Sequence, residues 1–232
     1  IAVAQWDGSK WLVTQLEYHP TFGSITKKTD PTGHETVYAY DSNGLLTSVT
    51  EKSVRDAKGN TTDIVTRFGY EYMSGWKLWQ QDPRGYVTEY RYDALGRTTE
   101  IKSPDDDDQP GWIPGVTESF RSNNPVTTIS YNDQDLYSIV NDPLQNQTKY
   151  DFNDLGQLVE LTKYRQVNNI YVPAAVTRLE YDNWGNISAI TDPNNKTIYY
   201  QYDAMGRNKS IKYPDDEGRT PIKRMDYDYS NN

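Results

Sequence analysis

The stretch DPNNKTIYYQYDAMGR, residues 192–207, contains a pattern that the chain writes four times. It opens with Asp-Pro, continues to a Tyr-Asp pair at Tyr202 and Asp203, and reaches Gly206 three residues after that aspartate. Earlier copies open at Asp30-Pro31, Asp82-Pro83 and Asp142-Pro143. Their aromatic, acid or amide, and glycine positions are Tyr40, Asp41 and Gly44; Tyr92, Asp93 and Gly96; and Phe152, Asn153 and Gly156. A spacing of about 50 to 60 residues indicates an array of similar supersecondary units.

The residue types of this pattern predict a β-hairpin turn. An Asp or Asn side chain can accept a hydrogen bond from the backbone two residues further on, and the later glycine allows the positive φ that reverses the chain. The loop is therefore expected to contain three to five residues. The strand before each turn shows a two-residue period with one aromatic face, as in Thr36, Tyr38 and Tyr40. The strand after the turn is expected to pack an aliphatic residue beside these aromatics: Val49, Ile101, Leu161 and Ile211.

A second, related turn precedes each Asp-Pro. Its clearest copy is Tyr181, Asp182 and Gly185, in which the glycine stands seven residues before Asp192. The same offset identifies Gly23 and Gly75 in the first two copies, and in the third copy Asp135 occupies the position of the glycine. The preceding aromatics are then Tyr18, Tyr72 and Tyr131, with a loop one residue longer in the first copy and one shorter in the second. These patterns predict hairpins of about 21 residues used in pairs. The expected double-hairpin units cover residues 18–51, 72–102, 131–162 and 181–213, and a truncated repeat begins near 225.

The remaining segments also indicate strands and turns. Residues 1–17 alternate around an Asp-Gly turn at Asp7-Gly8, while residues 52–70 and 163–180 resemble longer hairpins. Residues 103–127, rich in proline and aspartate, predict a long surface loop. Asp-Pro itself is expected at the corner where one hairpin passes to the next, because proline donates no backbone hydrogen bond and restricts the residue before it. No segment has a sustained helical period, so the expected fold is all-β with little or no helix.

Composition limits the classes of partner. Of 232 residues only 35% are hydrophobic, and the mean hydropathy is −0.90, yet there are 20 Tyr and 6 Trp. Aromatic rings with a polar tip are therefore expected to supply much of the buried area. The net charge of −9 argues against nucleic acid as a partner, and no apolar run has the length of a membrane span. Cysteine is absent, and the start at Ile1 without a signal peptide indicates a piece of a longer chain.

Candidate catalytic and metal sites have simpler explanations in the repeat. The aspartates of the Tyr-Asp pairs could serve as catalytic carboxylates, but their role in turns explains them and catalysis would not need four copies. The run Asp105 to Asp108 lacks the spaced ligands of a calcium loop, and His19 and His34 have no ligand cluster beside them. We therefore expect no catalytic, cofactor-binding or metal-binding residues.

Four tryptophans give an alternative. Trp76, Trp79, Trp112 and Trp184 lie in or beside expected turns and loops. An exposed tryptophan face is typical of carbohydrate-binding modules, whereas a chain so poor in aliphatic residues also needs tryptophan for packing. Packing between hairpins is the favoured interpretation, and glycan binding is the alternative.

The repeat resembles the YD repeats of the Rhs/YD-repeat family. The copy GYVTEYRYDALGR, residues 85–97, follows the family pattern G-x-x-T-x-Y-x-Y-D-x-x-G-R-L almost position for position, and the resemblance extends over nearly the whole chain. Departures are Phe152-Asn153 for Tyr-Asp, Gln145 and Asn195 for the first glycine, and Leu45 and Gln157 for the arginine. Such repeats occur in bacterial Rhs and wall-associated toxins, in Tc toxin shells and in teneurins. The resemblance therefore implies strands that spiral into a hollow shell, which in the toxins contains the cleaved C-terminal toxin.

Strand counting also predicts a curved sheet. Four units of two hairpins give about sixteen strands, which would span roughly 77 Å at about 4.8 Å per strand. Open sheets rarely exceed about ten strands without curling. We expect one continuous curved or spiral sheet. Together with the repeated hairpins, the family resemblance implies a non-enzymatic structural role in a secreted or surface-exposed protein. Its partners are then the flanking repeats and a cargo polypeptide of the same parent chain, with cell-surface glycans as the alternative.

Overall fold

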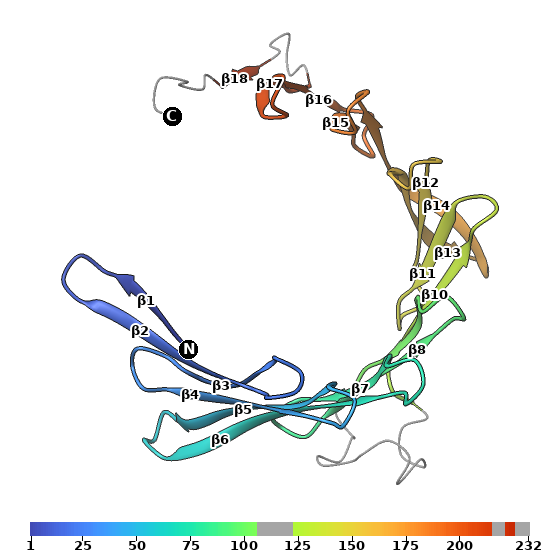
Figure 1. Cartoon of the computed structure of the whole chain (residues 1–232). Helices are drawn as coiled ribbons and strands as arrows, with labels where there is room; N and C mark the ends of the chain where they lie inside the picture. Colours follow the sequence, from blue (N-terminus) through green and yellow to red (C-terminus); the bar gives the residue numbers. More distant parts are fainter. Residues whose placement is uncertain (106–122, 215–220, 226–232) are drawn as a thin grey trace. The chain divides into compact units, whose positions relative to one another are not determined.

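The chain is all-β, as predicted. The computed structural model describes residues 1–105, 123–214 and 221–225, which contain eighteen β-strands and no helix (Figure 1). Two compact units, residues 1–126 and residues 127–232, divide the chain. Each unit contains tandem antiparallel hairpins.

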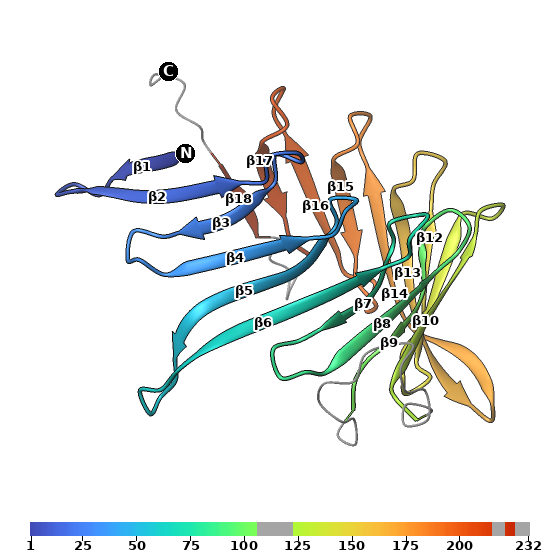
Figure 2. The same ribbon diagram turned by 60° about the horizontal axis from the view of Figure 1, so that its bottom comes forward.

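The N-terminal unit is a meander in which each strand pairs antiparallel with the next. Its register pairs include Val3 with Thr14, Tyr38 with Val49 and Trp79 with Glu89. Figure 2 shows strands β2 to β8 following one another with a gradual change of direction, the ordinary twist of a sheet. The strands are β1 (Ala2–Trp6), β2 (Trp11–Tyr18), β3 (Ile25–Thr29), β4 (Glu35–Tyr40), β5 (Leu46–Arg55), β6 (Thr61–Tyr70), β7 (Lys77–Gln81), β8 (Val87–Tyr92) and β9 (Thr98–Lys102).

The C-terminal unit repeats this arrangement. Every strand again pairs antiparallel with its successor, as in Leu161 with Thr177 and Ile190 with Ile198. The strands are β10 (Val126–Asn132), β11 (Tyr137–Asn141), β12 (Gln147–Phe152), β13 (Leu158–Val167), β14 (Ile170–Tyr181), β15 (Ile187–Thr191), β16 (Thr197–Tyr202), β17 (Asn208–Lys212) and β18 (Ile222–Arg224).

The aromatic and aliphatic residues of each hairpin lie directly opposite one another. Residues opposite each other in an antiparallel ladder share a face of the sheet, so each pair forms a cross-strand contact. The register shifts by one residue just before each aromatic that ends a strand, as between Gln201 and Tyr202. The aliphatic residue expected beside the aromatics of its hairpin lies opposite a tyrosine in all four units: Tyr38 with Val49, Tyr90 with Ile101, Tyr150 with Leu161, and Tyr200 with Ile211.

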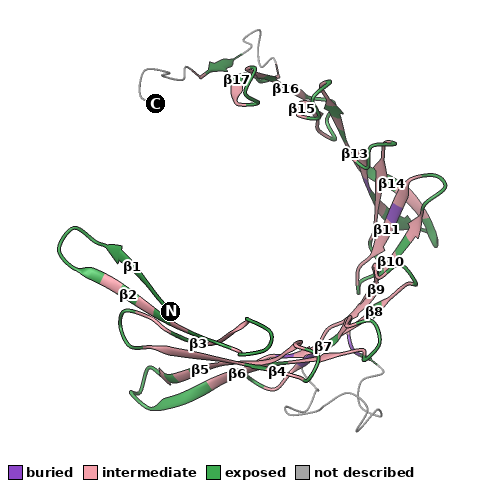
Figure 3. Cartoon of the chain, in the orientation of Figure 1, coloured by how far each residue is buried: buried purple, intermediate pink, exposed green. Residues whose placement is uncertain are grey.

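The sheet of each unit is a single layer with a thin core. Among the described residues only Val87 and Ala189 are buried hydrophobic side chains. Figure 3 shows partly buried residues along the strands and exposed residues at the turns. Since the described residues place no second layer over either face, cross-strand contacts supply most of the side-chain packing. Tyrosine suits such half-buried positions because its ring packs while its hydroxyl group stays polar.

Two hairpins are longer than the others. Strands β5 and β6 extend to a turn at Asp56 to Asn60, and strands β13 and β14 extend to Asn168 and Asn169, which both have positive φ. Most of the expected loop 103–127 lies outside the described residues, as does the repeat expected after 225. The ends of that loop are joined, since the Ser103 N–H donates to the Pro125 carbonyl oxygen at 2.9 Å. No described helix could cross a membrane.

Candidate functional site

The Tyr-Asp turn is a closed set of hydrogen bonds around one carboxylate. Oδ1 of Asp203 accepts the backbone N–H of Met205 at 2.9 Å and that of Arg207 at 3.0 Å. The Gly206 N–H donates to the Asp203 carbonyl oxygen at 3.0 Å, and the Asp203 N–H donates to the Arg207 carbonyl oxygen at 2.9 Å. Gly206 has φ of 75°, which a side chain would disfavour. This is a type I turn extended by a left-handed residue, a common short hairpin loop.

The same hydrogen bonds recur in four other turns of the pattern. Asp41, Asp93, Asn153 and Asp182 each accept two backbone N–H groups through Oδ1, at 2.9 to 3.0 Å. The glycines at the fourth position, Gly44, Gly96, Gly156 and Gly185, all have positive φ. The structure thus places the acid or amide and the glycine of these four turns in hairpin loops, where the hydrogen bonds of the side chain serve the backbone.

The Asp-Pro sequences form turns of the same geometry. Oδ1 of Asp192 accepts the N–H groups of Asn194 and Lys196, both at 2.8 Å, as Tyr-Asp aspartates do. Proline takes the second position, where its fixed φ suits a type I turn. Asn195 and Gln145 occupy the glycine place with φ of 60° and 63°. Asp-Pro is therefore more than a corner between hairpins, because it is itself the turn of a hairpin.

Turn hydrogen bonds lower the pKa values of several aspartates. The backbone N–H of Arg207 is the main cause that holds the pKa of Asp203 below its ordinary value, helped by the Arg207 guanidinium and opposed by burial. The side-chain amide of Asn186 has the leading effect in lowering the pKa of Asp182. These carboxylates are stabilised as anions, which suits hydrogen-bond acceptors and disfavours a general acid at neutral pH.

The arginine after the glycine closes two of the turns. Nε of Arg97 lies 2.7 Å from Oδ2 of Asp93, and Nε of Arg207 lies 2.8 Å from Oδ2 of Asp203. The third unit replaces both partners with neutral residues. There Nδ2 of Asn153 donates to Oε1 of Gln157 at 2.9 Å, so an amide pair occupies the place of the ion pair.

Tyrosine hydroxyl groups connect each Tyr-Asp turn to the strand before it. The Tyr40 hydroxyl group donates to the Ile25 carbonyl oxygen at 2.7 Å, where β3 begins. The same bond is formed by Tyr70 to Leu46, Tyr92 to Lys77, Tyr181 to Leu158 and Tyr202 to Ile187, at 2.8 to 2.9 Å. The ladder between neighbouring hairpins ends short of the turns, so these carbonyl groups lack a ladder partner and the hydroxyl group supplies the donor.

Phe152 shows how the connection is made without a hydroxyl group. Its backbone N–H donates to the Leu136 carbonyl oxygen at 2.8 Å. Leu136 precedes β11 and has φ of 53°. The main chain thus replaces the side chain at this connection.

Two turn assignments differ from expectation. Tyr70, two residues before the expected Tyr72, ends its strand and forms the hydroxyl bond, while Tyr72 is exposed in the loop. Glu71 takes the aspartate position, so this loop is longer than the standard turn rather than shorter. The positive φ expected at Asp135 belongs to Leu136.

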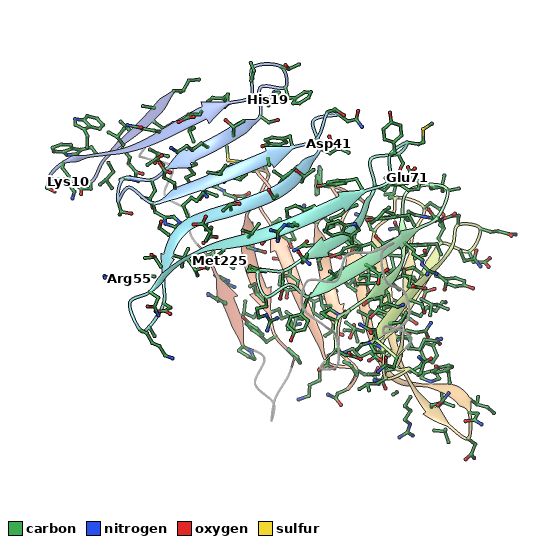
Figure 4. The ribbon with its side chains drawn as sticks, turned by 90° about the horizontal axis from the view of Figure 1, so that it is seen from below. Lys10, His19, Asp41, Arg55, Glu71 and Met225 are labelled. Atoms are coloured by element: carbon green, nitrogen blue, oxygen red, sulfur yellow. The ribbon has the colours of Figure 1, made fainter. Side chains whose placement is uncertain are left out.

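Sequence reasoning also missed residues that take the aspartate position without being Asp or Asn. Nδ1 of His19 accepts the N–H groups of Thr21 and Phe22 at 3.2 and 3.3 Å, and Oε2 of Glu71 accepts the Ser74 N–H at 2.5 Å. Figure 4 shows His19, Asp41 and Glu71 along one edge of the N-terminal unit, with Lys10 and Arg55 at the opposite edge. The sequence does contain a signal for His19 and Glu71, because each directly follows a tyrosine that ends a strand.

The tryptophans divide between packing and exposure. Trp76 lies 5.5 Å from Tyr92 between ring centroids and covers Gly96. Trp79 lies within β7, opposite Gly69, where a Cβ atom would come within 2.1 Å of its ring. Trp184, at the tip of its turn, is 87% exposed. Trp112 lies outside the described residues.

The described residues contain no group of three or more His, Asp or Glu side chains placed to hold a metal ion. The aspartates of successive turns serve their own backbones, as described above.

Comparison with known families and structures agrees with the repeat pattern. A family model described as RHS Repeat matches residues 21–53, 80–107 and 181–217. These segments include the Tyr-Asp turns at Asp41, Asp93, Asp182 and Asp203. No curated protein sequence matches the chain.

Two similar solved structures come from Tc toxin assemblies. The crystal structure of TcdB2-TccC3-Cdc42 gives a TM-score of 0.58 at 17% identity and covers 86% of this chain but 10% of that chain. A Photorhabdus luminescens Tc holotoxin pore carrying a TccC3 mutation gives a TM-score of 0.55 at 15% identity, covering 96% of this chain and 13% of that chain. At these identities the similarity shows the fold alone, and the chain spans only a small part of either structure.

Proposed function

Because the chain carries RHS repeats, we propose that it is a non-enzymatic segment of a shell wall in a YD-repeat protein. The Tyr-Asp turns and the double-hairpin units serve that wall as structural elements. The wall encloses or presents a polypeptide that belongs to the same parent chain. A secreted or surface-exposed parent fits this role, and flanking repeats are the immediate partners.

The observation that carries this proposal is the single-layer sheet with self-sufficient turns. Each turn satisfies its own backbone groups, and each described strand packs mainly on its two sequence neighbours. A sheet of this kind can extend as a thin wall, because no central core limits its width. The half-buried tyrosine and aliphatic pairs stiffen the sheet along its length.

The choice of a polypeptide as cargo rests on the similar structures. Their names place them in Tc toxin assemblies, and one of these contains Cdc42. The net charge of −9 supports the choice, since it disfavours nucleic acid as the enclosed material.

Limited proteolysis of the natural full-length protein tests the proposal. An enclosed polypeptide should be cleaved far more slowly in the intact protein than after mild denaturation. Gly206→Ala, which strains one turn, should increase that cleavage, whereas Ala204→Ser in the same turn should leave it unchanged. Equal cleavage in the intact and opened protein would rule out enclosure.

A glycan-binding module is the second candidate, and the exposure of Trp184 is the observation that favours it. A free indole face can stack on a sugar ring. Trp76 and Trp79 do not share this exposure, because both pack on neighbouring residues. A glycan array that gives signals lost in Trp184→Ala and kept in Trp76→Phe would support this candidate. An array without signals would remove it.

A further inference from the structure

Cationic side chains line a hollow on one face of strands β16, β17 and β18. Residues opposite each other in the ladder share a face, so these strands place two rows of three residues side by side. The rows are Tyr199, Lys212 and Ile222, and Gln201, Ser210 and Arg224. All six line a hollow of about 340 Å³. A second hollow of about 440 Å³ is also lined by Tyr199 and Lys212, together with Lys196. We call the surface formed by the two hollows the basic groove.

The positive charge of the basic groove is not neutralised, although the chain as a whole has a net charge of −9. Among the described residues, no Asp or Glu side chain lines either hollow. Lys196, Lys212 and Arg224 form no ion pair within the described part of the chain. In the register of this face, Glu180 of β14 lies two strands, or about 10 Å, from Tyr199. The three cations are therefore available to an anionic ligand.

Strands β12 to β14 provide an internal comparison, because the same face neutralises its own cations there. Nζ of Lys149 donates to Oδ1 of Asp151 at 2.5 Å. Nε of Arg178 lies 2.9 Å from Oε2 of Glu160. Cations on this face of the unit are thus paired with carboxylates on neighbouring positions, and the basic groove departs from that arrangement. The departure indicates that its charge is used for a contact outside these strands.

The spacing of the cations fits an extended peptide. Arg224 and Lys212 are diagonal neighbours on adjacent strands, a relationship that separates residues by about 7 to 8 Å. Alternate side chains of an extended chain recur at about 6.8 Å, so acidic residues at alternate positions can bring one carboxylate to each cation. The Ser210 hydroxyl group donates to Oε1 of Gln201 at 3.0 Å, which leaves the amide N–H groups of Gln201 as donors in the groove.

A sugar fits the basic groove less well than a peptide. The ring of Tyr199 is 48% exposed, but Nζ of Lys212 lies 5.9 Å from its centroid, within the range of a cation–π contact. A sugar ring that stacks on Tyr199 would compete with this ammonium group for the aromatic face. An acidic peptide needs no aromatic face, because its carboxylates bind the cations directly.

We propose that the basic groove binds an extended acidic peptide whose alternate carboxylates contact Arg224 and Lys212, with a further carboxylate at Lys196. Arg224 can hold a carboxylate through two parallel hydrogen bonds, and the lysines act as flexible point charges. These pairs lie at the surface, so each contributes modestly and weakens as salt is added. The inference rests on the groove alone and holds whether or not a wall encloses a cargo. Peptide binding and cargo proteolysis are measured separately, so either proposal can fail alone.

Fluorescence anisotropy of labelled peptides tests the proposal with the 232-residue chain at low salt. The probe is a short peptide that alternates serine and glutamate, and the reference peptide replaces each glutamate by glutamine. The glutamate peptide should bind about tenfold more tightly than the glutamine peptide, and added salt should reduce that difference. Equal affinities for the two peptides would overturn the proposal.

Two adjacent residues of β18 give a matched pair of variants. Arg224 lines the groove, whereas Lys223 lies opposite Ile211 and therefore on the other face, and both side chains are exposed. Arg224→Gln and Lys212→Gln should each weaken binding of the glutamate peptide about fivefold, as expected for an exposed charge pair at low salt. Lys223→Gln removes the same charge and should change the affinity less than about twofold.

Two further outcomes would contradict the proposal. Equal losses in Arg224→Gln and Lys223→Gln would show that the peptide responds to the net charge of the chain and not to the groove. An oligomer of galacturonic acid tests the other class of ligand. If it binds more tightly than the glutamate peptide and loses that binding in Arg224→Gln, the groove accepts acidic sugars and the choice of a peptide is wrong.

Discussion

The Tyr202 hydroxyl group donates a hydrogen bond of 2.9 Å to the carbonyl oxygen of Ile187, the first residue of the neighbouring strand β15. Burial raises the pKa of Tyr202, so the hydroxyl group keeps its proton at neutral pH. Because the same bond recurs at four other Tyr-Asp or equivalent turns, it connects successive hairpins beyond the reach of the ladder.

Tyr202→Phe should therefore lower the free energy of unfolding by about 1 kcal/mol, since it leaves a partly buried carbonyl group without its donor. Tyr200→Phe is the matched control: Tyr200 is also partly buried on β16, and its change should be under about 0.5 kcal/mol. Urea denaturation of the isolated chain measures both. Equal losses for the two variants would show that the hydroxyl bond to Ile187 is not a stabilising connection.

Gln145→Gly should stabilise the chain by about 1 kcal/mol, because Gln145 has φ of 63° and a side chain is disfavoured there. Leu144→Gly, at the preceding position of the same turn, should destabilise it, since glycine there only adds freedom to the unfolded chain. Thermal unfolding of both variants gives the comparison. A loss of stability in Gln145→Gly would contradict the strain at this position.

Gly69→Ala should destabilise the chain by more than about 2 kcal/mol, because the new Cβ atom would lie 2.1 Å from Nε1 of Trp79. The ring would have to leave its place opposite residue 69. In the Trp79→Ala background the same substitution should cost under about 1 kcal/mol, and a double-mutant cycle measures the difference. Additive effects would show that the ring does not lie against this glycine.

Asn153→Asp combined with Gln157→Arg should reproduce the ion pair that Asp203 forms with Arg207. The pair lies at the surface, so a coupling of about 0.5 kcal/mol is expected, decreasing as salt is added. The double-mutant cycle is measured by urea denaturation at low and high salt. A coupling that does not respond to salt would show that the third unit gains no charge contact.

Acid should destabilise the fold through the turn carboxylates. Hydrogen bonds to neighbouring residues hold the pKa values of Asp30, Asp56, Asp142, Asp182 and Asp203 below the ordinary value of 3.8. A carboxyl group with a lowered folded-state pKa contributes stability that is complete above its unfolded pKa and is lost as pH falls through the folded pKa. The unfolding midpoint should thus be constant above about pH 5 and fall below about pH 4.

Asp203→Asn should reduce the steepness of this acid dependence, because asparagine keeps the turn but does not titrate. Asp154→Asn, at an exposed carboxyl group outside the turn bonds, serves as the control. Urea midpoints between pH 2 and pH 7 provide the test. An unchanged slope in Asp203→Asn would show that this turn does not contribute.

The turns and strands could be predicted from the sequence because each depends on residues that are close together in the chain. The spacing of Tyr202, Asp203 and Gly206 determines a turn through bonds among five consecutive residues, so the pattern is visible without a structure. The alternation before each turn similarly indicates the strand and its aromatic face. Combining the two patterns predicted that Ile211 lies beside the aromatic residues of its own hairpin, and the structure places it opposite Tyr200.

Features that depend on a neighbouring hairpin could not be read in this way. Tyr70 and Tyr72 both fit an aromatic position, and only the bond from Tyr70 to Leu46 distinguishes them. The position of Trp79 against Gly69 depends on the register of two strands, and the pattern of turns placed Trp79 near a loop. The acceptors of the tyrosine hydroxyl groups are the first residues of neighbouring strands, and the repeat pattern does not show which strand meets which tyrosine.

Within each unit, described contacts between strands join elements that follow one another in the chain. Among the described residues, a hairpin therefore packs on its neighbours in the chain, and no distant part of its unit fixes how many hairpins the unit contains. If a two-strand segment is duplicated or lost, each remaining hairpin still packs on hairpins of the same kind. The gene for such a protein can therefore gain or lose hairpins one at a time, because no shared core has to change. Folding can likewise begin at any hairpin and advance as the chain emerges, because each new strand needs only the strand made just before it.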